Sequence, residues 1–131
     1  SEYDAFRFIF DFYQLKLGPQ DYMNPQSDLV SKIVNHYQKL SENFGVEKLP
    51  EEDYVNNMGY QFMSMKQFKK SEDFFNLNIV NYPESFNVYD SLGDLYVAMG
   101  KKDKAIEQFK KSLSLNPESY SKDKLKKLME D

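Results

Sequence analysis

The sequence predicts an all-α fold, an α-α superhelix of about seven antiparallel helices closed by a C-terminal capping helix. Three observations predict it. The chain repeats itself at an offset of 34 residues. Apolar residues recur three and four positions apart, which is the spacing of one helix face. Glycine and proline stand at most of the boundaries between these periodic segments, where they end or begin helices.

Composition limits the class of protein and of partner. The 131 residues fit one domain, and the chain has no cysteine, which excludes disulfides and thiolate metal sites. The net charge of -4 argues against nucleic acid, and no apolar run approaches the roughly 20 residues of a membrane span. We therefore expect a protein partner, no nucleic acid, no membrane and no cofactor.

Residues 1–17 predict an N-terminal helix that is apolar on all sides. One face carries Phe6, Ile9, Phe10 and Tyr13, and the other carries Phe8, Phe12 and Leu15. A helix that is apolar on all sides is usually buried on several sides. We therefore expect a missing partner, either a second copy of the chain or another domain. The chain begins with Ser1 instead of Met, and we expect it to be cut from a longer protein.

Residues 18–49 predict a linker followed by one helix. Asn24 and Pro25 read as its N-cap and first position, and Gly45 ends it. The apolar positions between them follow helical spacing: Leu29, Val30, Ile33, Val34, Tyr37, Leu40 and Phe44.

Residues 50–83 and 84–117 are the two copies of the repeat. Identities across the offset are Gly59 with Gly93, Met65 with Met99, Lys70 with Lys104, Phe75 with Phe109, and 83–85 with 117–119. Each copy predicts a helical hairpin. A glycine inside a helix costs about 1 kcal/mol, so its recurrence indicates close approach by a neighbouring helix. We expect Phe75 and Phe109 to be buried between the helices.

Residues 118–131 predict a short capping helix with a polar, solvent-exposed outer face, as helical repeats require. Its apolar edge is Tyr120, Leu125, Leu128 and Met129.

The second copy resembles the tetratricopeptide repeat family. The residues that carry the resemblance are Tyr89, Leu92, Gly93, Tyr96, Gly100, Ala105, Phe109 and Pro117, in the family's order. The first copy departs from the pattern at Val55, where an aromatic residue is usual, and at Lys66, where glycine is usual. We therefore expect a looser turn in the first hairpin.

The resemblance implies a partner-binding groove formed by the first helix of each hairpin. Its face would hold Asp53, Asn56, Asn57, Tyr60, Met63, Asn87, Asp90, Asp94 and Val97. Repeats that bind the acidic C-terminal tails of heat-shock chaperones use Lys, Arg and Asn there, whereas this face has no Lys or Arg. Asp90 and Asp94 would repel a terminal carboxylate, so we expect no binding of such tails. Tyr60 and Met63 fit ordinary core packing equally well.

A second resemblance concerns a parent protein. The runs 58–61 and 87–93 are similar to helical-repeat tails of bacterial serine hydrolases, and 2–10 is similar to the last helix of α/β-hydrolase esterases. The resemblance implies a catalytic domain before Ser1, in a bacterial protein of the periplasm or the cytoplasm.

The chain itself carries no catalytic motif. It has no Gly-x-Ser-x-Gly elbow, no His-Glu-x-x-His zinc motif and no phosphate-binding glycine loop. Its single histidine, His36, lies inside a helical run, and the acid pairs 51–52 and 72–73 fall in or near the first turns of predicted helices, where acids favour the helix dipole. The sequence thus predicts a non-catalytic interaction or scaffold module. The alternatives are a part of the hydrolase that shapes its active site, a dimerisation element, and a free peptide-binding adaptor.

Overall fold

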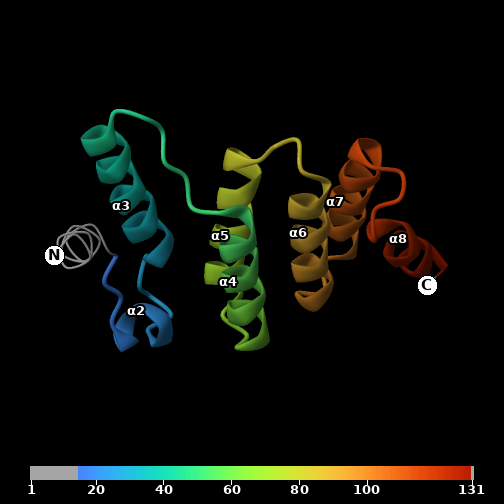
Figure 1. The fold of residues 1–131 in the computed structure, drawn as a ribbon. Helices are drawn as coiled ribbons and strands as arrows, with labels where there is room; N and C mark the ends of the chain where they lie inside the picture. Colours follow the sequence, from blue (N-terminus) through green and yellow to red (C-terminus); the bar gives the residue numbers. More distant parts are fainter. Residues whose placement is uncertain (1–14, 131) are drawn as a thin grey trace, which may run out of the picture. The chain divides into compact units, whose positions relative to one another are not determined.

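The computed structural model describes residues 15–130, which form seven α-helices and no strand (Figure 1). The helix expected over 1–17 falls mostly outside the described residues, and its last positions, 15–17, are not helical. The described chain divides after Pro50 into two compact units, which are treated separately below.

The first unit contains α2 (Pro19–Met23) and α3 (Leu29–Phe44). Pro19 stands at the first position of α2, and the Gly18 backbone N–H donates to the Asp21 carboxylate at 2.7 Å. Gly45 ends α3 in the left-handed conformation, at φ 70°, and its N–H donates to the Ser41 carbonyl at 3.0 Å. The predicted C-terminal end of this helix is confirmed.

The predicted start of that helix at Asn24 is wrong. Asn24 ends α2, and its side-chain oxygen accepts a 3.0 Å hydrogen bond from the Gln26 backbone N–H. This local bond closes a turn over Pro25 instead of starting a helix. The N-cap of α3 is Asp28, whose carboxylate accepts from the backbone N–H of Ser31 at 3.1 Å.

The second unit consists of two antiparallel hairpins and a final helix (Figure 1). The helices are α4 (Glu52–Ser64), α5 (Phe68–Asn81), α6 (Phe86–Ala98), α7 (Lys102–Leu115) and α8 (Ser121–Glu130). α4 packs on α5 and α6 on α7 within the hairpins, and α5 packs on α6 between them. α8 packs on α7. Each repeat copy is therefore one hairpin, as the 34-residue offset predicts.

Phe75 and Phe109 are buried, with relative exposures of 0% and 1%. They belong to one apolar cluster, whose other buried members are Leu92, Leu95, Tyr96 and Ala105. A Cβ atom on Gly59 would overlap the ring of Phe75, and one on Gly93 would overlap the ring of Phe109. The helices approach so closely because these positions carry no side chain, which confirms the reason inferred for the repeated glycine.

The two hairpin turns have the same backbone geometry. Lys66 adopts φ 59° and Gly100 adopts φ 73°. The residue after each donates its N–H to an aromatic residue's carbonyl at the end of the preceding helix, Phe62 at 2.9 Å and Tyr96 at 2.8 Å. The expectation of a looser first turn is wrong, because the hydrogen bonds hold Lys66 in a conformation that suits glycine better.

α8 places Leu125 and Leu128 against the apolar cluster, as predicted, whereas Tyr120 and Met129 are largely exposed. The offset also shows why α8 can face water. Where α6 has Tyr89, Leu92, Gly93 and Tyr96, α8 has Asp123, Lys126, Lys127 and Glu130. These charged residues are exposed, which gives α8 the wet outer face of a cap.

Candidate interaction face

The groove positions of α4 and α6 lie side by side. The Tyr60 hydroxyl on α4 donates to the Asp94 carboxylate on α6 at 2.5 Å, and the Ser91 hydroxyl donates to the Asn56 side-chain oxygen at 2.5 Å. Both bonds join residues about one repeat apart. The two helices therefore present their groove positions as one surface, which we call the groove face.

α8 extends this surface and adds a cation to it. The Lys124 amine donates to the Asp90 carboxylate at 2.8 Å and to the Asp94 carboxylate at 2.9 Å. The other Asp90 oxygen accepts from the Ser121 hydroxyl at 2.6 Å, and Asp90 is only 3% exposed. Burial lowers the pKa of the Lys124 amine, but its bonds to the two carboxylates outweigh that effect and raise it above the usual 10.5.

The expectation that the groove face has no lysine is wrong, because it considered only the two full repeat copies. Lys124 lies one repeat length after Asp90, so extending the 34-residue offset into the capping segment would have found it. The charges on the groove face therefore differ from those that the sequence predicts. Asp90 and Asp94 are matched by one ammonium ion, and Asp53 is the further carboxylate among the predicted groove residues.

The predicted groove residues fall into two groups. Asn56, Tyr60, Asp90 and Asp94 are engaged in the bonds between helices described above. The others are exposed or half-buried: Asp53, Asn57, Met63, Asn87 and Val97. Tyr60 and Met63 also pack against the apolar cluster, and the Tyr60 ring meets Phe75 edge-on at 5.1 Å between centroids. For Tyr60 the structure thus shows core packing.

Two tyrosines on this unit act as neutral donors to carboxylates. Burial, followed by the hydrogen bond to Asp94, raises the pKa of Tyr60 far above 10. Burial, and then the 3.1 Å hydrogen bond to Glu72, raises the pKa of Tyr96 to about 12. Both hydroxyls therefore keep their protons across the physiological range.

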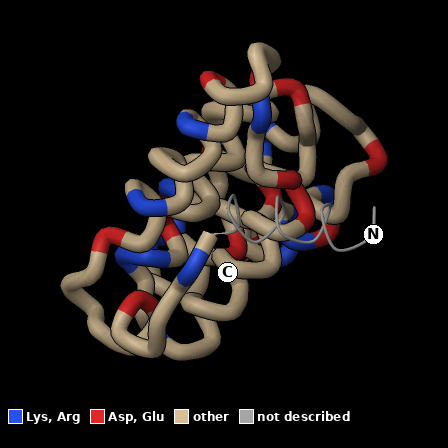
Figure 2. The backbone as a smooth tube through the Cα atoms, turned by 60° about the vertical axis from the view of Figure 1, so that its left-hand side comes forward, with Lys and Arg blue, Asp and Glu red and all other residues tan. Residues whose placement is uncertain are grey.

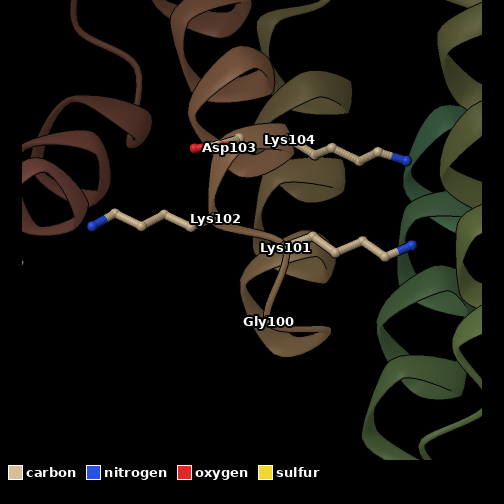
Figure 3. Close-up of a pocket in the computed structure, with 5 residues that line it drawn as sticks. All are labelled: Gly100, Lys101, Lys102, Asp103 and Lys104. Carbon is tan, nitrogen blue, oxygen red and sulfur yellow. The ribbon is translucent and has the colours of Figure 1, made fainter.

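A shallow depression lies at the turn between α6 and α7 (Figure 3). It encloses about 450 Å³ and is lined by Gly100, Lys101, Lys102, Asp103 and Lys104. Lys101 and Lys104 point to one side of α7, and Lys102 points to the other. The amines do not converge, so the depression is not built to hold an anion.

Charge and metal-ligand chemistry add no further site in residues 15–130. Basic and acidic positions are interleaved along the described backbone (Figure 2). Within that range, no three His, Asp or Glu side chains group as a metal would require. Among the helices of residues 15–130, we find none with the length and hydrophobicity of a membrane-spanning segment.

Comparisons with known proteins agree with this geometry. The family model of the tetratricopeptide repeat matches residues 86–119, which span α6, α7 and the loop after them. That segment is similar to a tetratricopeptide repeat. Among solved structures, the chain is similar to the first tetratricopeptide domain of Spaghetti (RPAP3) bound to the HSP90 peptide SRMEEVD. The identity is 17%, the TM-score is 0.56, and the match covers 78% of this chain and 79% of that one. No significant match was found among curated proteins.

The structural likeness establishes the fold class, an all-α superhelix of tetratricopeptide type, as the sequence predicts. The family match covers only the second repeat copy. The first copy shares its hairpin and its glycine–phenylalanine contact although it departs from the family at Val55 and Lys66.

Proposed function

We propose that this chain is a non-catalytic protein–protein interaction module that binds a partner segment on the groove face of α4 and α6. The observation that carries the proposal is that some polar side chains of that face are bonded within the chain whereas others are exposed. The polar side chains between α4 and α6 are bonded to one another, while Asp53, Asn57 and Val97 remain exposed beside half-buried Met63 and Asn87. The exposed set combines polar groups and apolar surface, which a short extended segment can use together.

Site-specific photocrosslinking tests the location. A benzoylphenylalanine at Val97 should yield a partner adduct, because that side chain is 46% exposed on the groove face. The matched control is Val80, which is 75% exposed and lies on α5, the second helix of its hairpin. An adduct at Val80 and none at Val97 would place the partner elsewhere.

We further propose that the module does not bind acidic chaperone tails on this face. Lys124, the cation within reach of Asp90 and Asp94, is already held by both, so a peptide carboxylate would meet uncompensated acid at Asp53. RPAP3's first domain was solved with the peptide SRMEEVD, and the same peptide serves as the probe. Titration calorimetry should give no heat of binding. Micromolar affinity would overturn this proposal and leave the interaction module intact.

The finer proposal is that the module is the tail of a bacterial serine hydrolase, where it acts as a scaffold, a dimerisation element or a support for the catalytic domain. Its support is the sequence similarity of runs such as 58–61 and 87–93. If the tail only binds, the full-length parent and a version lacking the tail should hydrolyse p-nitrophenyl esters with equal turnover per folded molecule. A large loss of turnover in the shortened version would instead assign the tail to the active site.

A further inference from the structure

The docking site of α8 contains a buried carboxylate, Asp90, and the ion pairs that Lys124 makes with Asp90 and Asp94. Asp90 would be a buried carboxylate without a countercharge if Lys124 were absent, and an isolated buried charge is strongly unfavourable. The site therefore selects a cation. It also selects a hydroxyl three positions earlier, since Ser121 donates to the second oxygen of Asp90.

Apolar contacts complete the recognition pattern. Leu125 and Leu128 pack against the cluster around Phe109. With Lys124 they form the sequence Lys-Leu-x-x-Leu on one face of α8. The opposite face is charged and exposed, so it contributes nothing to docking.

α8 is also the element of this unit best suited to detach. It has ten residues, and a helix of that length is marginally stable in water by itself. Ser121 is its single buried residue, whereas α6 has eight. Elements with few buried contacts open at a lower free energy than the core.

From these observations we propose that the surface of α6 and α7 under α8 is an exchangeable binding site for a lysine-bearing amphipathic helix of a partner protein, filled in this structure by α8 itself. The Asp90–Asp94 pair binds the partner's ammonium, and the cluster around Phe109 binds two apolar residues one and four positions further on. Charge complementarity and the pattern of α8 define this partner. The inference does not rest on the proposed function, which concerns the exposed side chains from Asp53 to Val97.

The test uses the full chain and a fluorescent peptide with the sequence of residues 117–131. In the variant Lys124→Glu, a third carboxylate faces Asp90 and Asp94 and weakens docking of the chain's own α8. We expect this variant to bind the peptide at least tenfold more tightly than the wild-type chain does. A peptide with glutamate at the position of Lys124 should bind at least tenfold more weakly.

The matched control is Lys127→Glu, which makes the same charge change on the exposed face of α8. It should bind the peptide as the wild type does. Equal binding by Lys124→Glu and Lys127→Glu, or no binding by a Lys124→Glu chain that circular dichroism shows to be folded, would overturn the proposal. A concentration-dependent dimer of the wild-type chain would assign the site to a second copy's α8 and likewise overturn it.

Amide hydrogen exchange of the wild-type chain provides the measurement that needs no variant. If α8 opens by itself, its amides should exchange at least tenfold faster than those of the buried part of α6. Equal rates in α6 and α8 would show that α8 leaves only on global unfolding, which contradicts an exchangeable site.

Discussion

At the residue scale, the clearest link from sequence to packing is the pairing of a helical glycine with a phenylalanine ring. Gly59 and Gly93 could be recognised from the sequence because glycine is costly inside a helix and recurs at the repeat offset. The rings that fill the space, Phe75 and Phe109, could be recognised in the same way. What the sequence did not reveal is how close the contact is, since that depends on the crossing of the two helices.

Replacing Gly93 with alanine should destabilise the protein although alanine is the better helix former. Alanine's propensity contributes about 1 kcal/mol of stability, but its Cβ would overlap the Phe109 ring, and overpacking costs about 1–3 kcal/mol. We expect a net loss, measured by urea unfolding. The double variant Gly93→Ala with Phe109→Leu should lose less than the sum of the single variants. Strict additivity would show that no steric conflict exists.

Lys66 and Gly100 occupy equivalent left-handed positions in the two turns, so each can be replaced by the other's residue type as a test. Lys66 has a Cβ atom in a conformation that costs a non-glycine residue about 1 kcal/mol or more, and Gly100 has open space around the position of a Cβ. Lys66→Gly should therefore stabilise the protein by up to about 1 kcal/mol, and Gly100→Lys should destabilise it by a similar amount. Chemical denaturation of both variants measures this. A loss of stability in Lys66→Gly would mean that the lysine side chain contributes more than its backbone strain costs.

At the element scale, helix ends were less predictable than helix existence. The periodicity placed every helix of residues 19–130 except the five-residue α2, which is too short to show a period. The start of α3 was misplaced because Asn24 and Asp28 are both good N-cap residues. The choice between them depends on which backbone N–H lies within reach, and only the folded chain shows that.

The cap of α3 can be tested directly. Asp28→Ala removes an acceptor from the Ser31 N–H and should destabilise α3 by about 1 kcal/mol. Asn24→Ala should have little effect on α3, because Asn24 bonds to Gln26 in the preceding turn. Amide hydrogen exchange in the first turns of α3 should accelerate in the first variant alone. Faster exchange in Asn24→Ala would restore Asn24 as the start of the helix.

At the scale of the whole described chain, the repeat predicted which helices pair but not the polar contacts between repeats. The bonds from Tyr60 to Asp94 and from Lys124 to Asp90 and Asp94 depend on the rotation of each helix about its axis. The rotation of each helix cannot be predicted from a list of the residues on its groove face. Four of the nine residues predicted to face a partner therefore proved to be engaged with their own chain: Asn56, Tyr60, Asp90 and Asp94.

The buried tyrosines make the stability of the fold sensitive to alkali. The folded chain raises the pKa of Tyr96 from its unfolded value of 10.0 to about 12, first by burial and then by the bond to Glu72. Because the folded state favours the protonated hydroxyl, this stabilisation is complete below pH 10 and is lost as the pH rises toward 12. The urea midpoint should accordingly fall over this interval.

Tyr96→Phe should lower stability at neutral pH, because it removes the bond to Glu72, and should make the decline above pH 10 shallower. Tyr120→Phe is the matched control, since that tyrosine is 70% exposed, and its decline should parallel the wild type. The lysines are the same in the wild type and in both variants, so the difference between the two variants isolates the buried hydroxyl. Parallel curves for Tyr96→Phe and the wild type would show that the fold does not favour the neutral form of Tyr96.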